Sequence, residues 1–125
     1  MNFRFLWLFV AAVLVQGCRE GPTNIRLMND YSLSSYEWNP ENRYFIEQSG
    51  KVIVPPLVKS VATHGNIIYG YFDWSGDSAF EPMPSGYFLI DAASNEVRSG
   101  LLWSDIASAV PAAKKSQLKD PSELR

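Results

Sequence analysis

The sequence predicts a mainly β domain: a small antiparallel meander, sandwich-like or a partly closed sheet, with one short C-terminal helix at about residues 104–110. Two observations predict it. Between residues 25 and 97, short runs of β-branched and aromatic residues alternate with turn-forming Gly, Pro, Asn and Ser. After these runs, one stripe of apolar residues follows the period of a helix. With 125 residues, the chain has room for one such domain, placed at residues 25–110.

The first 17 residues form a segment separate from this domain. A basic start at Arg4 precedes the apolar run Phe5–Val15, which is 11 residues long. A membrane-spanning helix needs roughly 20 apolar residues, so the run is too short to cross. A basic start, a short apolar run and a small residue at the end are typical of a secretory signal peptide. We therefore predict that residues 1–17 are removed, with a buried core helix as the alternative.

The chain has a single cysteine, Cys18. Residues 15–18, Val-Gln-Gly-Cys, resemble the lipobox of bacterial lipoprotein precursors, although Gln16 departs from the small or hydroxylated residue that is commoner there. The resemblance implies that Val15 and Gly17 are recognition positions and that Cys18 receives two or three acyl chains, palmitate among them. Two chains or more are needed for stable anchoring, because one chain binds a membrane only marginally. An intermolecular disulfide or a free thiol are the alternatives.

The same resemblance implies a location. The mature protein would be anchored to the cell membrane or the outer membrane and would face the periplasm or the exterior. Arg19, directly after the cysteine, favours the outer membrane, because an Asp there tends to retain such proteins in the inner membrane. Residues 18–24 form a short tether, so the domain would sit close to the membrane.

About six or seven strands follow in sequential hairpins. The residues from 66 to 74 are apolar on both faces, which predicts a central strand covered on two sides. Turns are predicted at Ser49-Gly50, at Gly65-Asn66 and at residues 91–95. The strand candidates are Tyr31–Trp38, Tyr44–Gln48, Lys51–Val54, Leu57–His64, Asn66–Trp74, Gly86–Asp91 and Glu96–Arg98.

The helix and the tail complete the chain. Apolar residues fall at helical spacing from Trp103 to Val110, Ser104 is placed to cap the helix, and Pro111 ends it. Residues 111–125 are polar, with few large apolar groups, and predict frayed helix or disorder.

Part of the mature chain also resembles a family of small, uncharacterised bacterial lipoproteins. The resemblance rests on the pieces Val58–Ile68 and Gly86–Val97, the second of which contains Gly-Tyr-Phe-Leu-Ile-Asp. That family has no established activity, so the resemblance implies no mechanism.

Few residues suit catalysis. His64 is the only histidine, and with Ser60 or Ser75 and Asp73 it would supply the parts of a nucleophilic triad. A histidine before a Gly-Asn turn is more simply a solvated strand end. Zinc is disfavoured, because no second histidine exists and the cysteine would be acylated.

The loop from residue 73 to 81 carries Asp73, Asp77 and Glu81. Its oxygens suit a hard cation such as calcium, but the glycine spacing excludes an EF-hand. Asp77 and Glu81 would also serve as the acid and base of a glycosidase. A polar loop between two strands explains the same residues, so we predict no metal and no cofactor.

Aromatic and methionine side chains gather in and after this loop. Such residues in an irregular Pro-rich loop on a rigid sheet predict a binding surface, and the alternative is that they cover one end of the core. The residues are Trp74, Phe80, Met83 and Tyr87. Tyr31, Tyr36 and Trp38 raise the same question.

Together, these features predict a lipid-anchored envelope protein that acts as a non-catalytic binding or inhibitory module. Its partner would be another envelope protein or a glycan. The formal net charge of −2 argues against nucleic acid. The alternatives are an envelope hydrolase that uses the carboxylates of the Asp73–Glu81 loop, and a structural subunit of an envelope complex.

Overall fold

The computed structural model describes residues 23–35 and 43–124. The predicted signal peptide, the lipobox with Val15, Gly17 and Cys18, and residues 18–22 of the predicted tether lie outside the described residues. So do Tyr36 and Trp38. The predictions that concern them remain predictions.

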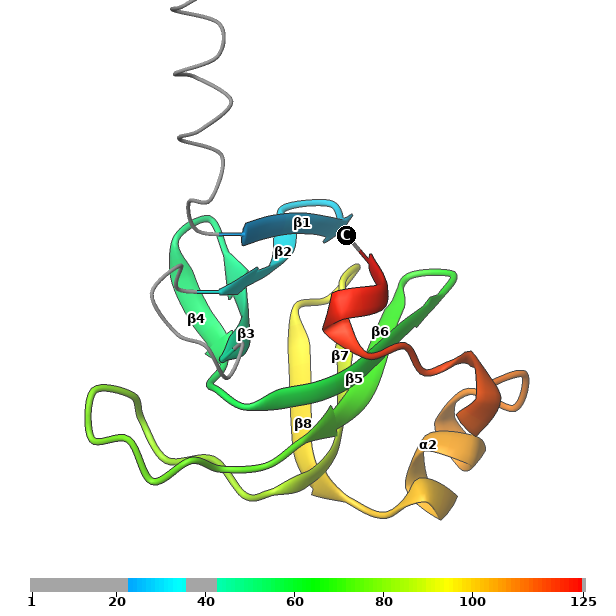
Figure 1. Cartoon of the computed structure of the whole chain (residues 1–125). Coiled ribbons are helices and arrows are strands. Elements are labelled where there is room, and N and C mark those ends of the chain that lie inside the picture. Colours follow the sequence, from blue (N-terminus) through cyan, green and yellow to red (C-terminus); the bar gives the residue numbers. More distant parts are fainter. Residues whose placement is uncertain (1–22, 36–42, 125) are drawn as a thin grey trace, which may run out of the picture.

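The described chain forms two antiparallel sheets of four strands each (Figure 1). In each sheet the strands lie in chain order, so both sheets are meanders. The prediction of a mainly β, antiparallel, sandwich-like domain is confirmed. The first sheet holds β1 (Thr23–Met28), β2 (Tyr31–Ser35), β3 (Tyr44–Gln48) and β4 (Lys51–Val54). The second sheet holds β5 (Val58–His64), β6 (Ile67–Phe72), β7 (Gly86–Asp91) and β8 (Glu96–Leu101).

The strand that sequence analysis did not identify is β1. Thr23 and Asn24, assigned to the tether, belong to this strand and pair with Ser35 and Ser34 of β2. The Asn24 side chain also donates a hydrogen bond to Ser34 Oγ at 3.0 Å. The folded domain therefore begins two residues earlier than predicted.

The main hydrophobic core lies between the two sheets. Strand β6 is covered on both of its faces, as the sequence predicts. Ile68 and Phe72 point into the inter-sheet core, whereas Tyr69 points to the opposite face. This follows from the alternation of side chains along a strand. The inter-sheet core contains Tyr31, Leu33, Tyr44, Ile46, Val54, Val58, Val61, Ile68, Phe72, Phe88, Ile90 and Ala92.

Gly70 allows close packing in the middle of β6. It lies directly opposite Phe88 of β7 and is fully enclosed. A Cβ atom at this position would collide with the backbone oxygen of Ser60 and would approach the Phe88 ring to 2.7 Å. The absence of a side chain at Gly70 therefore lets β5 and the Phe88 ring pack closely against β6.

One short helix, α2 (Trp103–Ala109), covers the outer face of the second sheet, with Ile106 buried beside Tyr69 and Leu89. Its predicted cap is wrong. Ser104 lies inside the helix, and the N-cap position belongs to Leu102, whose N–H donates to Asp105 Oδ2 at 2.8 Å. The helix starts one residue earlier than expected because the carboxylate of its third residue reaches back to the cap.

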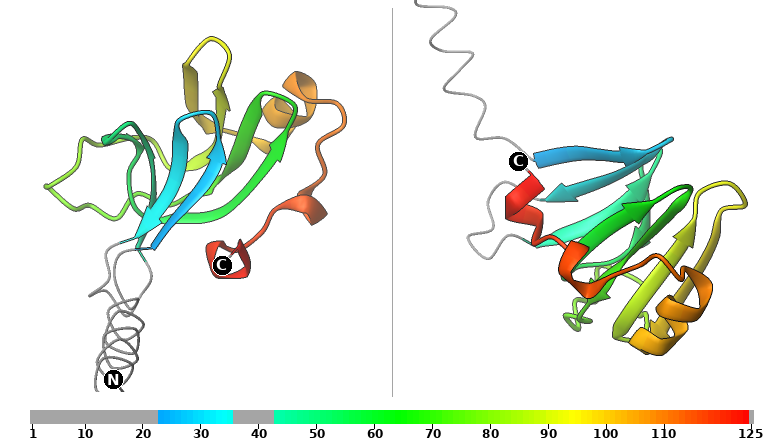
Figure 2. Two further views of the ribbon diagram at one scale, coloured as in Figure 1. Left: turned by 90° about the horizontal axis from the view of Figure 1, so that it is seen from above. Right: turned by 90° about the vertical axis from the view of Figure 1, so that its right-hand side faces the viewer.

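The tail is ordered, so the expectation of frayed helix or disorder is wrong for residues 111–124. It contains two 3₁₀ turns, η1 (Lys115–Gln117) and η2 (Pro121–Leu124). Between them, Lys119 pairs with Val61 through two backbone hydrogen bonds of 2.9 and 3.0 Å. In Figures 1 and 2 the tail runs from α2 past β5 and ends beside β1. The edge of β5 thus supplies the hydrogen-bond partners that order the polar tail.

Candidate binding grooves

The four residues predicted to form one binding surface do not lie together. Trp74 and Met83 pack against the inter-sheet core, which is the alternative that the sequence left open. Phe80 contacts Phe45 of β3, with ring centroids 6.2 Å apart. Tyr87 lies on the outer face of the second sheet.

Phe80 and Met83 nevertheless share a groove, which we call the loop groove. It lies between the 73–85 loop and β4, the outer strand of the first sheet, and has a volume of about 500 Å³. Val52 of β4 is 37% exposed there. The residues that line the loop groove are Lys51, Val52, Ile53, Pro55, Ala79, Phe80, Glu81, Pro82 and Met83.

Internal hydrogen bonds hold the 73–85 loop in shape. The Trp74 N–H donates to Ser85 Oγ at 2.8 Å and closes the base of the loop. Asp77 accepts from the Ala79 N–H at 2.9 Å through Oδ1, while its other oxygen lies 3.5 Å from an Arg43 guanidinium nitrogen. The loop groove is therefore formed before any partner arrives.

The same contacts bear on the hydrolase alternative. Asp77 is engaged by Arg43 and by the turn that it caps, and Glu81 is an exposed residue at the loop groove. His64 is exposed at the end of β5, and the Asp73 backbone pairs with Leu57. Within residues 23–35 and 43–124, no three carboxylate, imidazole or thiol groups are placed to hold a metal ion.

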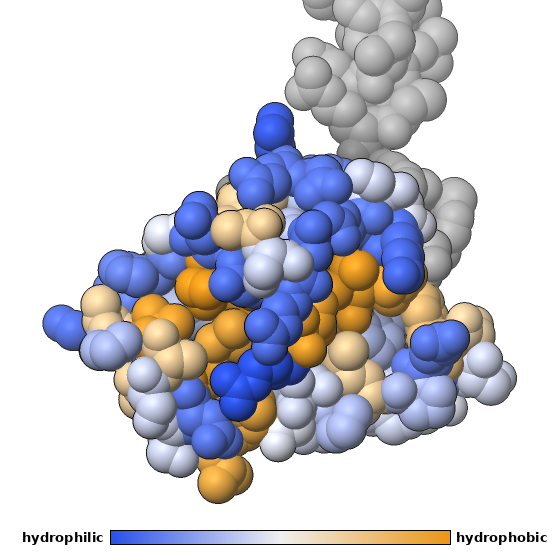
Figure 3. All heavy atoms as spheres, turned by 180° about the vertical axis from the view of Figure 1, so that it is seen from behind, coloured by the Kyte–Doolittle hydropathy of each residue, from blue (hydrophilic) through white to orange (hydrophobic). Residues whose placement is uncertain are grey.

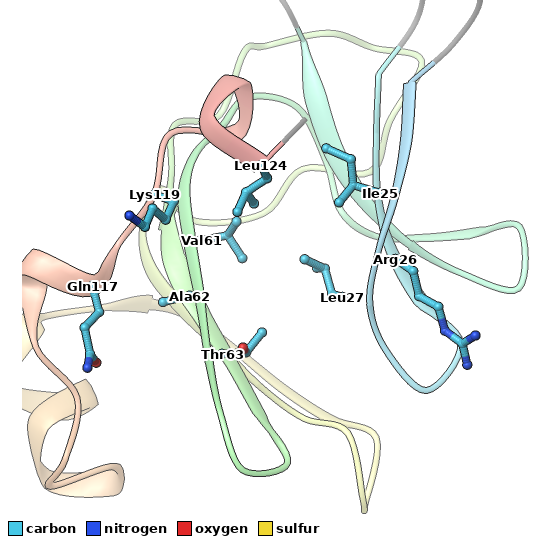
Figure 4. Close-up of a pocket in the computed structure, with 9 residues that line it drawn as sticks. All are labelled: Ile25, Arg26, Leu27, Val61, Ala62, Thr63, Gln117, Lys119 and Leu124. Carbon is cyan, nitrogen blue, oxygen red and sulfur yellow. The ribbon is translucent and has the colours of Figure 1, made fainter.

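A second groove, the edge groove, lies between β1 and β5 (Figure 4). Its volume is about 530 Å³. The predicted strands do not indicate this groove because β1 is not among them, although the alternation of Ile25 and Leu27 with polar neighbours is a strand signal. The lining residues are Ile25, Arg26, Leu27, Val61, Ala62, Thr63, Gln117, Lys119 and Leu124.

A third feature is an aromatic cluster on the outer face of the second sheet. Tyr87 packs edge-on against Tyr71 and Trp103, with ring centroids 5.1 and 5.3 Å apart. The Lys115 ammonium lies 5.9 and 5.7 Å from the Tyr87 and Trp103 centroids. Leu102, the residue before Trp103, is 70% exposed. Apolar residues are also exposed among polar ones on the face shown in Figure 3.

The shifted pKa values belong to structural contacts outside the grooves. Hydrogen bonds from Gln48 and Ser49 lower the pKa of the Asp30 carboxyl. Hydrogen bonds from Ser122 lower the pKa of Asp120 in the same way. Burial raises the pKa of the Tyr31 phenol, and the nearby charges of Asp30 and Asp91 add to that effect.

Comparisons with known protein families, with curated proteins and with solved structures return no match. Among the described residues, no helix has the length and apolar character needed to traverse a bilayer.

Proposed function

We propose that the protein is a lipid-anchored protein of the cell envelope whose β domain binds a partner protein and performs no chemistry itself. The observation that carries this proposal is the loop groove, where Phe80 and Met83 lie beside the exposed side chain of Val52. Aromatic and methionine side chains in a preformed hollow are typical anchors of protein interfaces.

The shape of the loop supports binding without rearrangement. Its hydrogen bonds, from Trp74 to Ser85 and from Ala79 to Asp77, order the backbone in the free protein. A partner would then lose less free energy to loop ordering on binding. This preorganisation favours an interface over a loop whose only role is to join two strands.

The sequence of residues 15–18 supports the anchor. Acyl chains on Cys18 would hold the domain at the membrane through the few residues before β1. In Figure 1 the 73–85 loop extends below β4, away from β1. An anchor before β1 would therefore leave the loop groove free to meet a partner in the envelope.

Photocrosslinking in the membrane tests the binding surface. With p-benzoylphenylalanine at Val52 in the full chain, we expect an adduct with a distinct envelope protein. The matched control carries the same probe at Arg98, an exposed residue of β8 outside both grooves. Equal adducts at the two positions, or an adduct with glycan alone, would contradict a protein partner at the loop groove.

The anchor needs its own experiment. In cells fed labelled palmitate, we expect the wild-type chain to carry label and Cys18→Ala to remain an unlabelled precursor. Label that persists in Cys18→Ala would overturn the lipidation proposal, whatever the crosslinking result.

A further inference from the structure

The edge groove has an apolar floor built from both sheets and the tail. In Figure 4, Ile25 and Leu27 of β1 face Val61 of β5 and Leu124 of η2 across the groove. Both strands are the outer strands of their own sheets. The groove is therefore the place where one side of the sandwich stays open.

The edge of β5 already accepts a chain segment. Both backbone groups of Val61 bond to Lys119 of the tail. Because hydrogen-bonding direction alternates along a strand, the N–H and C=O of Thr63 point to the same side, where no described residue pairs with them. The pairing is antiparallel, so the tail residues nearest Thr63 are those before Lys119, and these form η1 instead of a strand. The Thr63 edge is thus a free template for pairing.

The charges at this groove have one sign. Its lining contains Arg26 and Lys119 and no carboxylate, although the whole chain is acidic. Arg26 projects from β1 on the side away from the floor (Figure 4). A strand added here would place alternate side chains on the apolar floor, and all of its side chains would lie in the positive potential of these two cations.

We propose that the edge groove binds an extended segment of a partner protein, with alternating apolar and acidic side chains, by adding it to the sheet edge at β5. An acyl chain would fill the same floor, but it would cover the Thr63 amide without bonding to it, which is unfavourable. A peptide strand satisfies both the floor and the edge. This second binding site is independent of the anchor and of the loop groove.

Fluorescence polarisation with the full chain in nanodiscs tests the proposal. The probe is a labelled peptide of about eight residues, within ordinary strand length, in which Val and Glu alternate. We expect saturable binding that weakens about tenfold or more when the strand-pairing amides are N-methylated. We expect a similar loss when Lys replaces Glu in the peptide.

A charge-reversed variant distinguishes binding at this site from nonspecific binding. Arg26→Glu combined with Lys119→Glu should reverse the preference, so that the Lys peptide binds more tightly than the Glu peptide. Lys51→Glu, at the loop groove, is the matched control and should keep the wild-type preference. The proposal is overturned by an absence of saturable binding, by equal binding of the N-methylated peptide, or by an unchanged preference in the double variant. A fluorescent fatty acid provides the test for lipid. If it displaces the peptide from the wild type and no longer binds to Leu27→Glu, the groove would be assigned to lipid instead.

Discussion

The Tyr31 hydroxyl of β2 donates a hydrogen bond of 2.9 Å to Asn95 Oδ1 in the β7–β8 turn, and so joins the two sheets. Gln48 of β3 donates to the same oxygen at 2.9 Å and to Asp30 at 3.2 Å. The Tyr31 side chain is fully buried. One end of the sandwich is therefore held by a polar network as well as by the apolar core.

Tyr31→Phe should lower the free energy of unfolding by about 1 kcal/mol, the usual contribution of one hydrogen bond. The ring stays in the core, so the loss reports on the hydroxyl alone. Urea denaturation measures it, and Tyr71→Phe is the control because that side chain is 37% exposed. Equal losses in both variants would show that the link between the sheets contributes nothing.

The same hydroxyl predicts a dependence on alkaline pH. Burial raises the pKa of Tyr31, so the folded state holds this proton more tightly than the unfolded chain does. Its contribution is complete below the ordinary tyrosine pKa of about 10 and is lost as the pH rises from there through the folded-state pKa. The free energy of unfolding should therefore fall more steeply above pH ~10 in the wild type than in Tyr31→Phe. Urea titrations across this range would contradict the prediction if the two slopes agreed.

Gly70→Ala should lower the free energy of unfolding by about 3 kcal/mol, near the upper end for an overfilled core. The added methyl group would meet the Ser60 carbonyl oxygen, which belongs to the backbone and has little freedom to move, as well as the Phe88 ring. Gly65→Ala is the comparison. Gly65 has a φ of 57° but open space around it. Gly65→Ala should therefore lower the free energy of unfolding by only roughly 1 kcal/mol, the cost of a left-handed backbone for a residue with a Cβ atom. Thermal or urea unfolding that ranked Gly65→Ala as the worse variant would contradict this account.

Local patterns predicted most strands, because alternation and turn residues are local signals. The turn at Ser49-Gly50 needs two residues with positive φ, and both have it, at 49° and 86°. The tail was mispredicted for the opposite reason. Nothing near Lys119 in the sequence indicates that its backbone will pair with Val61, which precedes it by 58 residues.

The candidate binding residues show the same limit. Trp74 and Tyr87 flank one loop, so the sequence suggests that they lie together. Tyr87 pairs across the strands with Tyr71 and points to the outer face, whereas Trp74 packs on the inter-sheet core. Which face a side chain occupies depends on strand register, and a list of aromatic residues does not contain that information.

Pairing between the tail and β5 can be tested at Lys119. Lys119→Pro removes the N–H that donates to the Val61 oxygen at 3.0 Å, and it should expose amides of residues 118–124 to faster hydrogen exchange. The extended backbone of Leu118, with φ −67° and ψ 126°, already suits a following proline. Lys119→Ala keeps the N–H and should leave exchange unchanged. If both variants exchange alike, the tail is held by its side chains instead.

Leu102 occupies a position that favours a polar residue. Its φ of −88° and ψ of 161° are those of an N-cap, yet its side chain makes no capping hydrogen bond and is 70% exposed. Leu102→Ser should therefore raise the free energy of unfolding by about 0.5–1 kcal/mol, since a serine oxygen there can accept the N–H of Ser104, the second residue of the helix. Leu101→Ser is the matched control. Leu101 packs against the cluster under α2, so that variant should be less stable. Calorimetric melting of the two variants measures the difference. If Leu102→Ser melts at a lower temperature than the wild type, the leucine stabilises the fold through packing. Capping would then not decide the stability of this helix end.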